Sequence, residues 1–225
     1  MPDYRFTTKW FEANAKYWDI LKTHLTQNFG SDLRCVDVGT HEGRSAVWMA
    51  ENLVGTNGSI HIVDPVRENY KDNLLHNLSV IPNPKQTNLL AGDSVVELPR
   101  LLGEYGEYFH FIYIDAGKTA SDNCLNALIA ERMLLKNGLL VVDDYLWGEP
   151  NVDQRLSPRL GIDVYSSLSL LTTPQNTPRT QAVFLKVFDN KKLDFARGYH
   201  IEVWGGMGAP TYGTGFNVNN FNKFF

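Results

Sequence analysis

Four charged residues stand at the ends of two apolar segments and have side chains suited to cation binding or proton transfer. Asp115 ends one apolar run and is followed three residues later by Lys118, while Asp143 and Asp144 end another run. Adjacent parallel strands end at the same edge of a sheet, so we expect the three carboxylates to converge. Carboxylates that share one place repel one another unless they are protonated or bind a cation. Their hard oxygen atoms suit Mg²⁺, Mn²⁺ or Ca²⁺ better than zinc.

The same four residues also have a purely structural interpretation, which the sequence leaves open. Asp143 and Asp144 can cap the segment that follows them, and Asp115 can form a surface ion pair with Lys118 at the start of a helix. Two histidines near these segments, His41 and His110, are interpreted as loop and strand-edge residues rather than as catalysts.

A glycine-spaced turn is the second feature with chemical potential. It reads Val-Asp-Val-Gly-Thr-His-Glu-Gly-Arg-Ser over residues 36–45, between an apolar run and a helix-like segment. Gly39 and Gly43 allow the backbone to approach a ligand closely, and the free N–H groups at the helix start favour an anionic group such as a carboxylate. The spacing D-x-G-x-x-x-G, which starts at Asp37, differs from the dinucleotide fingerprint G-x-G-x-x-G.

Two further acidic residues follow the next two apolar runs. Asp64 stands 27 residues after Asp37, where an acidic side chain commonly binds a ribose diol. Asp93 and Ser94 follow Gly92 at the end of the third run. Each of these residues taken alone can be a helix cap. Three such motifs at the ends of three successive strands together favour a nucleotide-like cofactor.

The elements that position these residues alternate along the chain, which predicts a doubly wound α/β domain with a mostly parallel sheet and an antiparallel last strand. The predicted strands are residues 33–38, 59–64, 87–91, 109–115, 138–143 and 181–188, with an additional one at 199–204. The predicted helices are residues 7–29, 44–53, 68–78, 94–102 and 119–135, with another possible over 156–171.

The predicted organisation is an N-terminal helical segment (1–30), a cofactor-binding domain (31–190) and a C-terminal extension (191–225) that packs on the same domain or on a neighbouring subunit. A net charge of −4 without a basic block argues against a nucleic-acid partner. No apolar run reaches the length of a membrane span, and two widely spaced cysteines favour a reducing, cytoplasmic location. We also consider a homo-oligomer possible.

The motifs resemble those of class I methyltransferases that use S-adenosylmethionine (SAM). The glycine turn looks like motif I of this family, and Ala-Gly-Asp-Ser at residues 91–94 resembles the motif whose Asp meets the adenine amino group. The 28-residue spacing from Asp115 to Asp143, the acidic Asp144 and the position of Lys118 are similar to the metal site of catechol and caffeoyl-CoA type O-methyltransferases. The chain also resembles the sugar-modifying macrocin group. The resemblance spans about residues 33–147.

The resemblance implies roles for individual residues. In the resembling enzymes, the lysine at the position of Lys118 is a proton acceptor. Many relatives have Gly-Ser-His where this chain has Ala-Gly-Lys at residues 116–118, so the base would be lysine here instead of histidine. Catalysis is assigned to Lys118 and Asp115, and a divalent cation, Mg²⁺ or Mn²⁺, to Asp115, Asp143 and Asp144. Asp37 is expected to orient the glycine turn and the methionine amino group. The residues assigned to SAM are Asp37, Gly39, Thr40, Glu42, Gly43, Ser45, Asp64, Asp93, Ser94 and Asp115.

The function that these observations favour is metal-assisted O-methylation of a hydroxyl on a sugar or glycan. The preference over a phenol or catechol comes from residues 205–225, which are rich in aromatic residues, asparagine and glycine. Three alternatives are weighed. They are a metal-independent small-molecule methyltransferase, a nicotinamide-dependent reductase and a non-catalytic SAM-binding protein. This chain lacks the G-x-G-x-x-G turn that a nicotinamide-dependent reductase requires. A protein that only binds SAM does not require the acidic residues.

Overall fold

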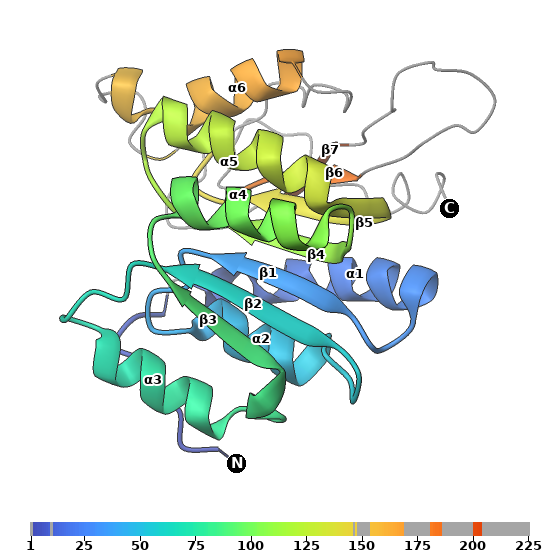
Figure 1. Cartoon of the computed structure of the whole chain (residues 1–225), viewed down its shortest axis with the longest axis vertical. Helices are drawn as coiled ribbons and strands as arrows, with labels where there is room; N and C mark the ends of the chain where they lie inside the picture. Colours follow the sequence, from blue (N-terminus) through green and yellow to red (C-terminus); the bar gives the residue numbers. More distant parts are fainter. Residues whose placement is uncertain are drawn as a thin grey trace.

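A computed structural model gives the structure of the chain and describes residues 2–9, 11–145, 147, 154–168, 181–185 and 200–203 (Figure 1). The proposed C-terminal extension (191–225) lies outside the described residues except for residues 200–203. The proposed division into segments therefore stays a prediction.

One sheet of seven strands forms the centre of the described part, in the order β3-β2-β1-β4-β5-β6-β7. The first five strands run parallel, and β6 and β7 pair antiparallel at one edge. The strands are β1 (Arg34–Val38), β2 (Ser59–Asp64), β3 (Thr87–Ala91), β4 (Phe109–Ile114), β5 (Leu134–Val142), β6 (Gln181–Leu185) and β7 (His200–Val203). This topology confirms the predicted Rossmann-like sheet with an antiparallel end.

Helices cover both faces of the sheet, with α1 and α2 behind it and α4 and α5 in front of it in Figure 1. The helices are α1 (Glu12–Phe29), α2 (Arg44–Asn52), α3 (Lys71–Val80), α4 (Ser94–Tyr105), α5 (Ala120–Met133) and α6 (Pro158–Leu168), with short 3₁₀ turns η1 (Pro84–Gln86) and η2 (Gln154–Leu156). Residues of α1, α2 and α3 join one hydrophobic core, and residues of α4, α5 and α6 join the other.

Alternating strand residues feed the two cores, as the period of two in a strand requires. In β1, Cys35 faces the core beneath α1, whereas Val36 and Val38 face the opposite core. Trp18 of α1 is fully buried and its ring meets that of Tyr113 edge-on, with centroids 4.7 Å apart. Helix α1 is therefore fixed on the sheet by aromatic packing.

Two element boundaries differ from the sequence prediction for identifiable reasons. Helix α1 begins at Glu12 rather than near residue 7. The segment before it is instead held against Glu42, whose carboxylate accepts from the backbone N–H and the hydroxyl of Thr7. Strand β5 begins at Leu134 rather than at residue 138, directly after α5. Leu134 pairs with Phe109 before an irregularity in the β4–β5 register.

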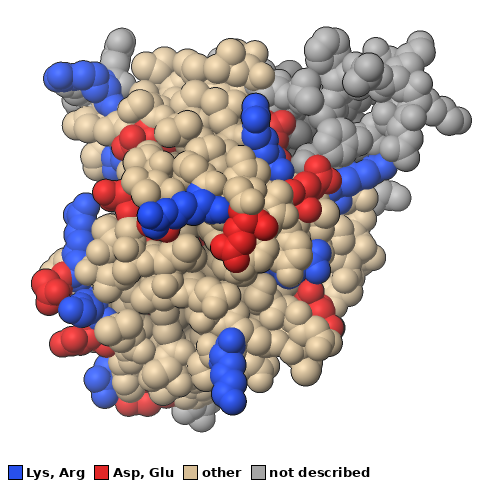
Figure 2. All heavy atoms as spheres, viewed as in Figure 1, with Lys and Arg blue, Asp and Glu red and all other residues tan. Residues whose placement is uncertain are grey.

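The surface shows charges of both signs. Acidic and basic side chains are interspersed over the face of the molecule shown in Figure 2. Among the described residues, no helix has the length and apolar character needed to cross a membrane.

Candidate functional site

The glycine turn after β1 passes tightly against the end of β4. Gly39 and Gly43 have φ angles of 87° and 85°, and His41 between them has φ 53°. A Cβ atom at Gly39 would lie 2.6 Å from the carbonyl oxygen of Asp115. Glycine is therefore required at position 39, both for its left-handed backbone and for the close approach of the two strand ends.

Asp37 organises this turn from inside the protein. One carboxylate oxygen accepts hydrogen bonds from the hydroxyls of Thr40 and Ser45, each 2.7 Å long. The other oxygen, Oδ1, is buried and has no hydrogen-bond partner among the described residues. Burial raises the pKa of Asp37 to about 6. Three of the residues predicted to bind the cofactor thus form one buried network that fixes the turn.

Glu42 lines the cavity and is bonded to protein partners, and its predicted contact with the cofactor stays a prediction. Its carboxylate accepts hydrogen bonds from the Thr7 backbone N–H at 2.7 Å, the Thr7 hydroxyl at 2.8 Å and the Asn73 side chain at 2.8 Å. Burial raises the pKa of Glu42, but these hydrogen bonds outweigh burial and lower it. The carboxylate is directed to protein partners because it secures the N-terminal segment.

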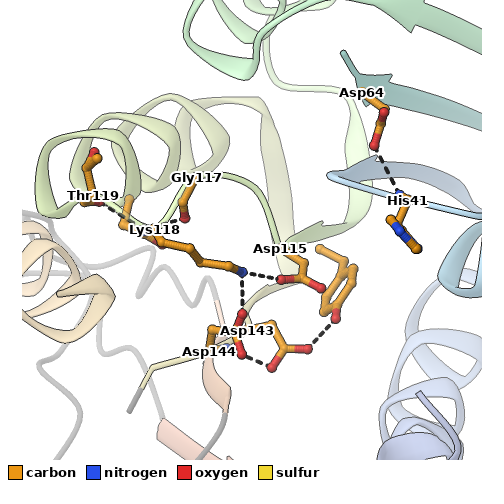
Figure 3. Close-up of polar contacts among 10 residues, drawn as sticks. His41, Asp64, Asp115, Gly117, Lys118, Thr119, Asp143 and Asp144 are labelled. Atoms are coloured by element: carbon orange, nitrogen blue, oxygen red, sulfur yellow. Dashed lines mark hydrogen bonds and ion pairs between the residues drawn. The ribbon is translucent and has the colours of Figure 1, made fainter. Parts of the chain in front are cut away.

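Asp64 lies at the end of β2 with only 2% of its surface exposed. Its Oδ1 accepts from the Val66 N–H and the Tyr70 hydroxyl, each at 2.7 Å, and its Oδ2 accepts from the His41 N–H at 3.0 Å (Figure 3). Carboxylate oxygens offer about four acceptor positions. Oδ2 can therefore accept one more hydrogen bond, as from a ribose hydroxyl.

Asp93 and Ser94 stand at the start of α4 beside the same cavity. Asp93 occupies the N-cap position, but its side chain makes no capping hydrogen bond with the helix. Ser94 accepts a hydrogen bond from the buried side chain of Asn126 at 2.9 Å. The geometry at Asp93 therefore favours ligand binding over the capping alternative.

The three carboxylates predicted to converge do lie together at the ends of β4 and β5 (Figure 3). The ammonium group of Lys118 donates to Asp115 at 2.7 Å and also to Asp144. Asp143 accepts from its neighbour's backbone N–H at 2.7 Å and from the hydroxyl of Tyr113. Side chains of Asp115, Lys118 and Asp144 are about one-third exposed, at 33%, 30% and 32%, so solvent can reach the cluster.

The electrostatics of this cluster favour additional positive charge. Burial, and then the nearby charge of Asp143, raise the pKa of Asp115 well above its ordinary value even though Lys118 lowers it. Burial lowers the pKa of Lys118, but Asp115 and Asp144 together outweigh burial and raise it. Lys118 is therefore held as an ammonium, which differs from the depressed pKa that a proton acceptor needs.

The donor chemistry of Asp115, Asp143 and Asp144 fits a hard divalent cation, because three carboxylates supply only oxygen donors at one place. In the described part of the chain, however, no three His, Cys, Asp or Glu side chains are arranged as a metal-binding group. Lys118 Nζ is bonded to two of the three carboxylates and serves as their counter-charge.

A single cavity of about 1250 Å³ joins the glycine turn to the carboxylate cluster. This exceeds the volume of roughly 300–1,000 Å³ that is typical of a pocket for one small molecule. The predicted site residues that line it are Gly39, Thr40, Glu42, Ser45, Asp64, Asp93, Ser94, Asp115, Lys118, Asp143 and Asp144. Asp37 and Gly43 are the two predicted residues that do not line the cavity. The structure thus places the other predicted residues around one space large enough for a cofactor and an acceptor.

Several residues of the cavity were not predicted from the sequence. Tyr70 holds Asp64, and Tyr113 holds Asp143. Lys9 and Phe11 line the cavity from the N-terminal side. Tyr113 lies two residues before Asp115 in the same predicted strand. This closeness to a predicted metal ligand is the one feature of the sequence that could have indicated a role for Tyr113 in the site.

Comparison with known proteins agrees with this geometry. Residues 36–145 match a family model described as a methyltransferase domain. A comparison with curated protein sequences gives no match.

Solved structures show the same fold at low sequence identity. The O-methyltransferase TomG from Streptomyces achromogenes, in complex with SAM, is 16% identical over 91% of this chain and 92% of that chain, with a TM-score of 0.55. An O-methyltransferase from Bacillus cereus, in complex with SAH, is 20% identical over 88% and 81% of the two chains, with a TM-score of 0.55. Cofactor-bound Rv0187 from MTB is 19% identical over 71% and 70%, with a TM-score of 0.53.

The family match covers the glycine turn, Asp64, Asp93 and the carboxylate cluster, all of which surround the cavity. Residues 36–145 therefore match a methyltransferase domain, and the sheet around them has the Rossmann-like fold of solved O-methyltransferases.

Proposed function

We propose that this enzyme transfers a methyl group from SAM to a hydroxyl of a sugar or glycan, assisted by a divalent cation at Asp115, Asp143 and Asp144. The observation that carries the proposal is the shared cavity. The glycine turn, Asp64 and Asp93 line one part of this cavity, and the carboxylate cluster lines another part.

The orientation of SAM follows from the polar groups around the cavity. The glycine turn, with Gly39 and Thr40 at the cavity wall, suits the amino-acid end of SAM, and Asp37 holds this turn from the interior. The remaining acceptor position of Asp64 suits a ribose hydroxyl. The carboxylate of Asp93, which makes no capping hydrogen bond with α4, suits the adenine amino group. In this orientation the sulfonium methyl group lies toward the carboxylate cluster.

Methyl transfer to oxygen requires the acceptor oxygen in line with the departing sulfur, at about 3–3.5 Å from the methyl carbon. The acceptor hydroxyl must also lose its proton. We assign acceptor binding and proton removal to Asp115 and Lys118, whose charged atoms are 2.7 Å apart and border the cavity. Both residues lie in the short segment between β4 and α5, which would fix the hydroxyl relative to the cofactor.

A bound divalent cation would stabilise the deprotonated hydroxyl. Asp115, Asp143 and Asp144 would hold it, and displacement of Lys118 Nζ from Asp115 and Asp144 would free their oxygens. The same displacement would separate Lys118 from the two carboxylates that raise its pKa. A cation also orients two neighbouring oxygens, so vicinal diols are suitable acceptors, and both sugars and catechols contain them.

The preference for a sugar is supported by the composition of residues 205–225, which lie outside the described residues. The exposed Trp147 at the cavity offers a ring on which a sugar face or a phenol can stack. A catechol or other phenol is therefore the alternative acceptor.

The test is release of S-adenosylhomocysteine (SAH) from SAM in the presence of mono- and oligosaccharides or of catechols, with and without Mg²⁺ or Mn²⁺. We expect turnover with a saccharide diol that rises when the cation is added. Turnover with catechols alone would replace the sugar assignment, and turnover that is unchanged by chelation would remove the cation from the proposal.

A further inference from the structure

The N-terminal strap, which we define as residues 2–9, is bonded to α2, α3 and the glycine turn rather than forming a helix. The side chain of Asn77 pairs with the strap backbone, accepting from the Arg5 N–H at 2.7 Å and donating to the Arg5 carbonyl at 2.9 Å. Two outer contacts complete the attachment, a 2.7 Å contact between the His76 ring and the Asp3 carbonyl and a 2.9 Å hydrogen bond from Tyr4 to Glu51.

Glu42 is the inner attachment point of the strap. Both of its carboxylate oxygens are engaged by Thr7, one by the backbone N–H and the other by the hydroxyl. Its backbone carbonyl accepts from Asn77 at 2.7 Å, so one α3 residue holds both the strap and the turn. Glu42 is only 2% exposed and Asn77 is fully buried. A buried carboxylate needs hydrogen-bond donors, and two of the three found here come from the strap.

The strap reaches the cavity immediately after this attachment. Thr8 and Lys9 line the cavity, whereas Thr7 does not. Glu42 itself stands between Gly39 and Gly43, so it connects the turn proposed to hold the cofactor with a second wall of the same cavity.

We propose that Glu42 is a positioning residue, which seats the N-terminal strap against the cofactor cavity so that cofactor binding and strap seating strengthen each other. Glu42 thus acts through Thr7 and not by touching SAM. The inference rests on the proposed function only for the identity of the cofactor. Linkage requires that the coupling be reciprocal, so SAH must protect the strap if the seated strap tightens binding of SAH.

Trypsin provides a direct readout, because the strap contains the cleavage sites Arg5 and Lys9. The experiment measures the rate of tryptic cleavage after these residues and the affinity for SAH by calorimetry, in the full-length protein. Glu42→Gln places an amide group against the Thr7 donors, and Thr7→Val removes the hydroxyl at a position outside the cavity. Tyr4→Phe is the matched control, since it removes a strap hydrogen bond that does not involve Glu42.

We expect SAH to slow cleavage of the wild-type strap. Glu42→Gln should speed cleavage and weaken SAH binding by about ten-fold or more, as the loss of hydrogen bonds to a charged group implies. Thr7→Val should change both quantities in the same direction by several-fold, and Tyr4→Phe should leave SAH affinity within about two-fold of the wild type.

Two results would overturn the inference. One is a folded Glu42→Gln variant with normal cleavage and normal SAH affinity. The other is weaker SAH binding in Glu42→Gln without faster cleavage and without any effect of Thr7→Val, which would make Glu42 a direct ligand. If the wild type does not bind SAH at all, the proposed function fails instead, while the cleavage rates still report whether Glu42 seats the strap.

Discussion

The side-chain nitrogen of Lys118 lies 2.7 Å from Oδ1 of Asp115, and this ion pair joins the segment before α5 to the end of β4. The pair borders the cavity and is about one-third exposed, so it is open to an acceptor as well as being part of the fold. This placement supports the catalytic role that we propose for both residues.

Replacing Lys118 should therefore impair the reaction more than the binding of the cofactor. For Lys118→Ala we expect kcat to fall by about 10²–10⁴-fold, the usual range for loss of a group that transfers a proton. The affinity for SAH should stay within a few-fold, because Lys118 is assigned to the acceptor. Lys71→Ala is the matched control, since within the described residues Lys71 pairs with the largely exposed Glu68 and does not line the cavity. Equal effects of the two substitutions would refute the catalytic role.

Cation dependence should reside in the acidic cluster. Asp143→Ala removes one of the three carboxylates, so stimulation of turnover by Mg²⁺ or Mn²⁺ should disappear, and chelation should bring the wild type to the level of the variant. Asp72→Asn, at an exposed position in the first turn of α3, should retain full stimulation. The measurement is SAH release against metal concentration. A fully active Asp143→Ala protein would rule out the cation site.

The turn after β1 should be intolerant of any side chain at position 39. Gly39→Ala introduces a Cβ atom at 2.6 Å from a backbone oxygen of Asp115 and places alanine at φ 87°. We expect a loss of about 1–3 kcal/mol in the free energy of unfolding and a large loss of SAH affinity. Gly103→Ala in α4 meets nothing within 4 Å, so it should stabilise the protein by about 0.5–1 kcal/mol. Chemical denaturation of the two variants tests this contrast.

The buried carboxyl of Asp37 should make stability depend on pH. Its folded-state pKa of about 6 lies above the ordinary value of about 4, so the folded protein binds the proton more tightly than the unfolded chain does. The contribution of Asp37 to the free energy of unfolding is therefore fully present below about pH 4 and is lost as pH rises through about 6. Asp37→Asn should remove this dependence, and relative to the wild type it should gain about 1–3 kcal/mol of stability between pH 4 and 7. A constant difference between the two proteins across this range would contradict the assignment.

Much of the cavity could be predicted because the relevant residues directly follow strands. The C-terminal ends of parallel strands share one edge of the sheet, so Asp64, Asp93, Asp115 and Asp143 were placed together without any knowledge of side-chain contacts. The alternation of apolar segments was sufficient to predict the order of helices and strands over most of the described residues.

The features that could not be predicted depend on contacts between distant residues. The hydrogen bonds between Thr7 and Glu42 span 35 positions and leave no periodic signal in the sequence. They accompany a helix that begins at Glu12 rather than near residue 7, and they direct both carboxylate oxygens of Glu42 to the N-terminal strap. Likewise, the pKa of Lys118 depends on Asp144, a residue 26 positions away whose direction is set by a left-handed backbone at φ 57°.

The central claim is that one cavity brings SAM and the acceptor together, and a crystal structure of the protein with SAH tests it most directly. We predict that the ribose hydroxyls meet Asp64, that the amino-acid end lies on the glycine turn at Gly39, and that the sulfur faces Asp115 and Lys118. An SAH molecule bound in another cleft, or in this cavity with its sulfur directed away from Asp115, would contradict the claim.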